Sequence, residues 1–400
     1  MLNHFLGGYL VENNIDGPFS SIHAERKNNK YPGPVIAGIF FSLTTILLTY
    51  GGGLLAFKNG FLRSGVGEVL FILLPVLIFL IVGKYNIKDT LKLRRTRPIN
   101  YLIVVFLMMF GMPVVGVLNA IVLGIIRLVF GKNLPIEQIS IPDVPTLFIA
   151  ILVIGISAAV CEETLFRGLI SKGYSKFGVV TSLVITSILF GILHRDIQKG
   201  VSTILLGALI GFIVHRTKSI YAGMVAHFTN NTVAVLLTFG AAKLSEKLDK
   251  VGINQAQSFD FSNIPTASLV IAIVFYALMF LGFVAGFVTL IYAFYRSTEK
   301  ESRLETVRMQ LQTKVDEDMQ VTNNTMATQG IQVTNNTMAT QEIPMPIVHK
   351  DRTNKFSVAA LIGVLPGVIL IFLTFVGQIL ELMNVNSGLL YNVLKALWLV

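Results

Sequence analysis

Residues 145–171 read PTLFIAILVIGISAAVCEETLFRGLIS, an apolar run that can cross a bilayer yet contains two glutamates and an arginine. A transmembrane helix needs about 20 mostly apolar residues, and similar runs fill most of the chain. They cover 34–57, 66–83, 101–130, 145–171, 178–194, 200–215, 219–241, 266–294 and 356–382. We therefore predict an all-α fold, a polytopic transmembrane helix bundle with about eight or nine spans.

The composition also indicates a membrane protein. Of the 400 residues, 53% are hydrophobic and only 14% are charged, whereas soluble domains are about 25% charged. We assign the net charge of +10 to loops that follow the positive-inside bias, not to nucleic-acid binding. The single cysteine, Cys161, excludes an internal disulfide framework and a multi-cysteine metal site.

The polar segments divide the chain into four predicted parts. They are an N-terminal polar segment at 1–33, a transmembrane core at 34–296, a low-complexity polar loop at 297–354 and an additional C-terminal membrane segment at 355–400. The polar loop contains a direct repeat, because residues 320–329 recur as residues 332–341. Its Thr, Asn and Gln content is typical of a tolerant linker.

The distribution of basic residues predicts the orientation. The loop after the second apolar run is rich in them, with Lys84, Lys88, Lys92, Arg94, Arg95 and Arg97. Placing this loop in the cytoplasm also places the N-terminus there. We therefore expect an integral membrane protein with a cytoplasmic N-terminus.

Polar residues inside the apolar runs are candidates for function. A charged residue at mid-membrane costs about 2.5–3.5 kcal/mol on insertion scales, so it is a functional-site hypothesis by default. Such residues fall in three runs, the fourth, fifth and seventh. They are Glu162, Glu163 and Arg167, then His194, then His227 and Asn231.

Helical spacing predicts how these side chains relate. Glu163 and Arg167 are four residues apart, share a helix face and can pair. Glu162 is rotated by about 100° around the axis and must point elsewhere. His227 and Asn231 also share one face. We expect all six polar groups to converge on one cavity, because each would otherwise need its own partner in lipid.

A carboxylate, imidazoles and an amide together suit hydrolysis. The carboxylate can act as a general base, and an imidazole can orient the attacking water. An amide and an imidazole N–H can donate to an oxyanion. The alternatives are a non-catalytic immunity or scaffold protein and a proton-coupled transporter, since transporters also bury carboxylates and histidines. A serine-protease interpretation is disfavoured, because Ala158 ends the Gly155-Ile-Ser157-Ala158 stretch where a rhomboid motif has glycine.

Three motifs in order resemble a known family. Glu162-Glu163-xxx-Arg167, Phe190-xxx-His194 and His227-xxx-Asn231 resemble the motifs of the CPBP intramembrane proteases. That family includes the type II CAAX prenyl endopeptidases and Abi-like bacteriocin-immunity homologues. The resemblance covers about residues 145–240, and the last span and the repeat-bearing loop lie outside it.

The resemblance implies a role for each motif residue. Glu162 would activate water with the help of His194, while His227 and Asn231 would stabilise the oxyanion. Glu163 and Arg167 would hold the geometry of the site, and Phe190 would pack beside it. The implied partners are membrane lipid and a peptide substrate, which is either a prenylated protein or a leader peptide.

The family is often labelled metalloprotease, so a zinc ion is also to be considered. If zinc were bound, its ligands would be Glu162, His194 and His227. We favour a mechanism without a metal cofactor. The sequence contains no His-Glu-xx-His motif, because Arg195 follows His194 and Phe228 follows His227.

Overall fold

The structure, a computed structural model, describes residues 30–135, 139–250, 265–329, 358–397 and 399. These residues form helices, turns and loops and contain no strand. Within them, seven helices are long and apolar enough to cross a membrane, and α10 (Val179–Leu193) is a shorter apolar helix. The predicted all-α polytopic bundle is therefore confirmed.

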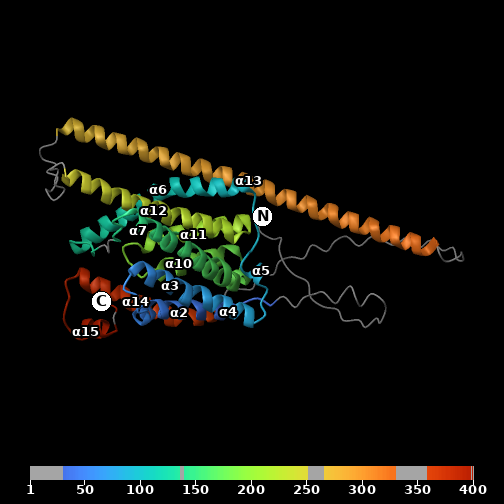
Figure 1. The fold of residues 1–400 in the computed structure, drawn as a ribbon, viewed down its shortest axis with the longest axis horizontal. Helices are drawn as coiled ribbons and strands as arrows, with labels where there is room; N and C mark the ends of the chain where they lie inside the picture. Colours follow the sequence, from blue (N-terminus) through green and yellow to red (C-terminus); the bar gives the residue numbers. More distant parts are fainter. Residues whose placement is uncertain (1–29, 136–138, 251–264, 330–357, 398, 400) are drawn as a thin grey trace. The chain divides into compact units, whose positions relative to one another are not determined.

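Figure 1 shows the order of the helices along the chain. The first half contains α2 (Pro34–Tyr50), η1 (Gly51–Leu54), α3 (Gly60–Glu68), η2 (Val69–Leu73), α4 (Leu74–Val82), α5 (Ile87–Thr90) and α6 (Pro98–Phe130). The second half contains α11 (Gly200–Thr217), α12 (Ile220–Lys250), α13 (Thr266–Gln329), η7 (Val358–Val364), α14 (Leu365–Leu382) and α15 (Leu389–Ala396).

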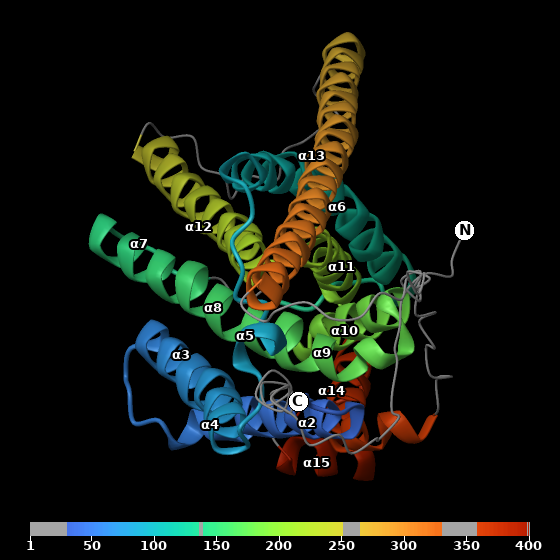
Figure 2. The same ribbon diagram turned by 90° about the vertical axis from the view of Figure 1, so that its right-hand side faces the viewer.

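A single long span of 34 residues, Val144–Phe177, lies between these halves and carries the first motif. It consists of α7 (Val144–Ala150), η3 (Ile151–Ser157), α8 (Ala158–Glu163), η4 (Thr164–Ile170), α9 (Ser171–Tyr174) and η5 (Ser175–Phe177). In Figure 2 it runs between the α2, α3 and α4 helices on one side and α10, α11 and α12 on the other. Residues 161–170 are all buried, so the motif lies in the interior of the bundle.

Two segments of this span, η3 and η4, are π-helical and flank α8. A π-helix widens the turn by one residue and is most often found at functional sites. The two π segments therefore set the direction of the side chains that α8 presents, including Glu162 and Glu163.

Small residues allow the helices around the motif to approach closely. On α10 and α11, a side chain at Gly191 would collide with Ile204, and one at Gly207 would press on Phe190. Near the N-terminal end of the bundle, η7 and α14 pack on α2. There Ser42 Oγ donates to the Gly363 carbonyl at 2.7 Å. Small residues at helix crossings are typical of membrane bundles.

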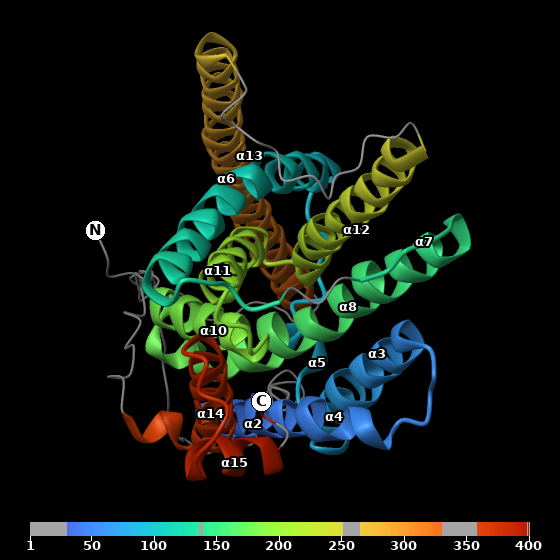
Figure 3. The same ribbon diagram turned by 90° about the vertical axis from the view of Figure 1, so that its left-hand side faces the viewer.

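Most of the predicted spans coincide with helices, and several of the helices extend beyond the predicted bounds. The second span begins at Gly60, six residues before the predicted start at 66. The third is one helix through Pro113, and Figure 3 shows α6 changing direction part-way along, as expected at a proline. Helix α12 is present but is not among the seven apolar ones, because it carries the polar third motif.

The segment predicted as a polar loop at 297–354 differs in its first part. Helix α13 continues without a break to Gln329, and residues 330–354 lie outside the described residues. Extending a helix is easier than starting one, and Arg303 adds an i,i+4 salt bridge to Glu299. By contact density the chain separates into two compact units, and the described part of the smaller unit is α13 from Tyr295 onward.

Candidate active site

A buried carboxylate, Glu163, binds two of the predicted site residues. Its Oε1 accepts a hydrogen bond from Arg167 Nη1 at 3.0 Å and another from His227 Nδ1 at 2.9 Å. Arg167 Nη2 also donates to the Gly207 carbonyl on α11 at 3.0 Å. The predicted pairing of Glu163 with Arg167 is therefore confirmed, and the structure adds His227 to the pair. Glu163 thus joins the fourth and seventh spans, and Arg167 joins them to the sixth.

The aromatic ring of Phe190 lies at the centre of the same cluster. The Arg167 guanidinium carbon is 4.4 Å from the ring centroid. The imidazoles of His194 and His227 have their centroids 5.1 Å and 5.7 Å from it. Phe190 is fully buried. It therefore separates the two histidines while keeping both within one small region.

The position of His194 is set by its own helix and by the loop that follows. It is the C-terminal cap of α10, and its Nδ1 lies 3.0 Å from the Phe190 carbonyl oxygen. A carbonyl only accepts, so Nδ1 carries the ring proton and the neutral ring leaves Nε2 as an acceptor. Arg195 has a left-handed φ of 52°, which turns the chain sharply after the histidine.

The last membrane segment holds this turn in place. Gln378 of α14 donates from Nε2 to the Arg195 carbonyl at 2.7 Å, and its Oε1 accepts from the Ile197 amide at 2.9 Å. Arg195 Nη1 donates to Thr49 Oγ1 of α2 at 2.9 Å. A segment outside the motif region therefore positions the loop that begins at His194.

Asn231 is held against the π-helical part of the central span. Its Nδ2 donates to the Ile154 carbonyl at 2.8 Å, and its Oδ1 accepts from Asn230 Nδ2 at 3.1 Å. One amide hydrogen of Asn231 is still available, because Nδ2 has two. Its predicted position one turn after His227, on the same helix, is confirmed.

Glu162 differs from its neighbour Glu163 in making no hydrogen bond or salt bridge with a described residue, although each of the two carboxylates has a buried Oε2 without a partner. It is only 8% exposed, and its Oε2 is buried without a hydrogen-bond partner among the described residues. No hydrogen bond joins Glu162 to His194 in that part of the chain. The water that we expect between these two side chains therefore stays a prediction.

The structure identifies one further acidic residue, Glu68, which the sequence analysis missed. Glu68 interacts electrostatically with Glu162, and its Oε2 also lacks a partner in the described residues. It lines a cavity of about 530 Å³ together with Arg63, Ser64, Ser140 and Ile154. Because the second span was predicted to start at 66, Glu68 fell at its edge. The signal was nevertheless present, since a lone carboxylate in an apolar run is itself a site hypothesis.

The fit of a zinc ion depends on the free ring nitrogens. Nδ1 of His194 and of His227 is already engaged, so each could offer only Nε2. Across the described ranges, no three His, Cys, Asp or Glu side chains are grouped as a metal site requires. Glu162, His194 and His227 are not grouped in that way in the described residues, and a mechanism without a metal stays a prediction. The proposed mechanism uses no metal ion.

Comparison with known proteins matches the same region. Residues 144–233 match the family of type II CAAX prenyl endopeptidase Rce1-like proteins. These residues contain all three motifs. This match and the three motifs support the similarity of the chain to the CPBP family proteases. A Bacillus subtilis (strain 168) protein named "Putative membrane peptidase YdiL" is 25% identical over 194 residues, which are 47% of this chain and 78% of that protein. No solved structure matches this chain.

The matched region places the CPBP motifs on the helices described above. All predicted site residues lie within residues 144–233, whereas Glu68 and Gln378 lie outside it. The protein is therefore a membrane protease whose family-defining segment is completed by residues from the second and the last spans.

Proposed function

We propose that this protein is an intramembrane endopeptidase in which Glu162 activates the attacking water. The observation that supports this is the contrast between two adjacent buried carboxylates. Glu163 is bound through Oε1 by Arg167 and His227, whereas Glu162 makes no hydrogen bond or salt bridge with a described residue, and its Oε2 is buried without a partner. A carboxylate that is not engaged by a cation can take a proton from water.

In the first step, water lies between Glu162 and His194. Glu162 removes one proton, and Nε2 of His194 accepts the hydrogen bond of the other. The oxygen of the water then forms a bond to the carbonyl carbon of the peptide. Because the Phe190 carbonyl holds the Nδ1 proton, His194 presents the acceptor nitrogen to the water throughout.

In the second step, His227 and Asn231 stabilise the tetrahedral oxyanion. His227 can donate from Nε2 only when both ring nitrogens are protonated, since Nδ1 already donates to Glu163. Glu163 then stabilises an imidazolium. Asn231 contributes the amide hydrogen that the Ile154 carbonyl leaves unused. Two such donors are what an oxyanion hole requires.

In the third step, the intermediate collapses. The carbon–nitrogen bond breaks, and protonated Glu162 returns its proton to the leaving nitrogen. The products are a carboxylic acid and an amine, and the enzyme recovers its starting protonation. We propose a membrane-associated substrate, either a prenylated protein or a leader peptide, and a bacterial plasma membrane location with a cytoplasmic N-terminus.

Comparing membrane peptidomes tests the proposal. A strain that expresses Glu162→Ala should accumulate at least one uncleaved peptide that the wild-type strain cleaves. Identical peptidomes at equal expression would contradict proteolysis and favour a non-catalytic immunity or scaffold role or a transporter. Adding a chelator to the purified enzyme should leave cleavage unchanged. Loss of cleavage that zinc restores would contradict the metal-free mechanism.

A further inference from the structure

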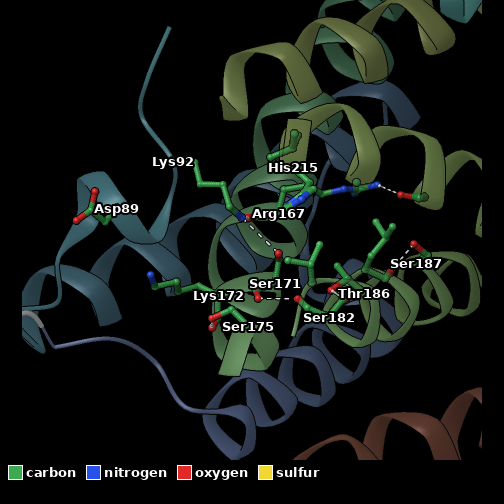
Figure 4. Close-up of a pocket in the computed structure, with 15 residues that line it drawn as sticks. Asp89, Lys92, Arg167, Ser171, Lys172, Ser175, Ser182, Thr186, Ser187 and His215 are labelled. Atoms are coloured by element: carbon green, nitrogen blue, oxygen red, sulfur yellow. Dashed lines mark hydrogen bonds between the residues drawn. The ribbon is translucent and has the colours of Figure 1, made fainter. Parts of the chain in front are cut away.

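A second cavity, of about 170 Å³, lies on another side of Arg167 (Figure 4). Its lining comes from four parts of the chain: the 83–97 loop, the end of the central span, α10 and α11. Its basic side chains are Lys92, Arg167, Lys172 and His215, and Asp89 is the acidic one. This cavity has no role in the proposed cleavage mechanism.

The residues that line the cavity do not neutralise the positive charges of its two lysines. Lys92 Nζ donates to the Arg167 carbonyl at 2.6 Å and to Ser171 Oγ at 3.3 Å, which are uncharged acceptors. Lys172 Nζ lies 3.7 Å from the ring centroid of Tyr31. No salt bridge in the described residues involves either lysine. The charge of Asp89 is already shared, because Arg94 Nη2 pairs with it at 3.2 Å.

Arg167 itself has a donor without a partner in the described residues. Its side chain is 2% exposed, and its Nε is buried without a hydrogen bond. Its two other nitrogens bind Glu163 and Gly207. A buried unpaired donor on a charged group is costly and is commonly explained by a water or ion that completes it. The cavity that Arg167 lines can hold such a group.

The electrostatics at Lys92 also favour an anion beside its ammonium group. Burial, together with the positive charges of Lys172 and Arg167, lowers the pKa of the Lys92 ammonium to about 8. Glu163 acts in the opposite direction. A cation that is destabilised in this way would be stabilised by an anion placed beside it.

We propose that this cavity binds a phosphate group. Lys92, Lys172 and the Nε of Arg167 would bind its oxygens, and the hydroxyl hydrogen of Ser171 adds a fourth donor. Several donors from different directions suit a tetrahedral oxyanion. The shared chemistry is a phosphate, which can be the headgroup of an anionic phospholipid or free inorganic phosphate.

The position of the cavity favours the lipid as the source. Lys172 and Ser175 lie in the last turns of the central span, and Val179 lies in the first turn of α10. Val179 lines the cavity and is itself 49% exposed, so an apolar rim adjoins the basic interior. Basic pockets between transmembrane helices are known recognition sites for phospholipid headgroups.

Binding to the full-length protein in an uncharged detergent tests the proposal with two probes. The first is inorganic phosphate, titrated at constant ionic strength while thermal unfolding is followed. The second is phosphatidylglycerol, whose retention is measured by native mass spectrometry against phosphatidylcholine. We expect saturable binding of at least one probe, and Lys92→Met and Lys172→Met should each weaken it at least tenfold.

Lys176→Met is the matched control, because Lys176 is exposed, lies four residues after Lys172 and does not line the cavity. It should bind as the wild type does. Lys172→Met keeps the test valid if Lys92→Met fails to fold. Binding of phosphate alone or of phosphatidylglycerol alone supports the site and identifies its source. Binding of neither probe, or equal binding by Lys172→Met and Lys176→Met, would overturn it.

Discussion

The surroundings of Glu162 and of Glu163 differ sharply, although the two residues are adjacent in sequence. Glu163 is fully buried and bound to Arg167 and His227. Glu162 makes no hydrogen bond to a cation in the described residues; it interacts electrostatically with Arg167 and with another acid, Glu68 of the second span. On one side of the helix a carboxylate completes a charge-balanced network. On the other side two carboxylates meet.

This difference distinguishes a carboxylate that stabilises the fold from one that can take part in proton transfer. A buried ion pair is strongly destabilised when one partner is removed, because the other charge stays buried. A carboxylate without a cation contributes little to stability but is available for proton transfer. Neutralising each acid in turn should therefore give opposite patterns of stability and activity.

Glu162→Gln should have the largest effect on cleavage. Removing a general base typically costs about 100- to 10,000-fold in rate, and glutamine keeps the size of the side chain. We expect the variant to insert and unfold like the wild type while cleavage falls below detection. The measurement pairs a cleavage rate with thermal unfolding in detergent. A variant that cleaves at the wild-type rate would contradict the glutamate mechanism.

Glu163→Gln should be the most destabilising of these changes. It leaves Arg167 buried without its ionic partner, a loss of about 3–5 kcal/mol by analogy with other broken buried pairs. Folded yield and unfolding temperature should fall together with activity. If instead this variant is stable and inactive while Glu162→Gln unfolds, the roles of the two carboxylates are reversed.

Glu68→Gln tests the second acid of the pair. Neutralising Glu68 removes a negative charge that interacts with Glu162, so the electrostatic field at the proposed base changes. We expect cleavage to slow by roughly tenfold and the pH–rate profile to shift, with stability unchanged or raised. Glu381→Gln, at an exposed acid on α14, is the control and should change neither. An unchanged pH–rate profile for Glu68→Gln would count against a coupled pair.

Gln378→Ala should have the smallest effect. It removes two hydrogen bonds to the loop after His194, each contributing about 0.5–1.5 kcal/mol. We expect a modest fall in unfolding temperature and a several-fold lower kcat with KM unchanged, because the side chain only positions His194. Asn392→Ala on α15 serves as the control, since Asn392 is exposed. A change in KM alone would contradict a positioning role.

The sequence predicted the helical elements well, because a helix that crosses the bilayer requires a long run of hydrophobic residues. Each of the nine runs coincides with a helix in the structure. The bounds were less accurate where polar residues extend a helix. Gly60–Ser64 lengthen the second span, so Glu68 lies further from its start than predicted. Residues 297–329 extend α13, although their composition predicted a loop.

The candidate site was predictable only in part. Spacing alone indicated that Glu163 pairs with Arg167, since both lie on one helix face. It could not indicate that His227, 64 residues later in the chain, donates to the same oxygen. It also could not place Gln378 beside the Arg195 turn. Such contacts depend on how helices pack, and helix packing is not encoded by local periodicity.

The sequence by itself therefore determined that this protein lies in a membrane and which polar groups its spans carry. Apolar length requires a bilayer, and polar residues inside the spans mark the motif helices. Only the tertiary structure decided which groups are neutralised and which are left available. That choice depends on distances of a few ångströms between separate helices, over which charges in a dry interior interact strongly. Glu163, Glu162 and Lys92 acquire their different characters from those distances.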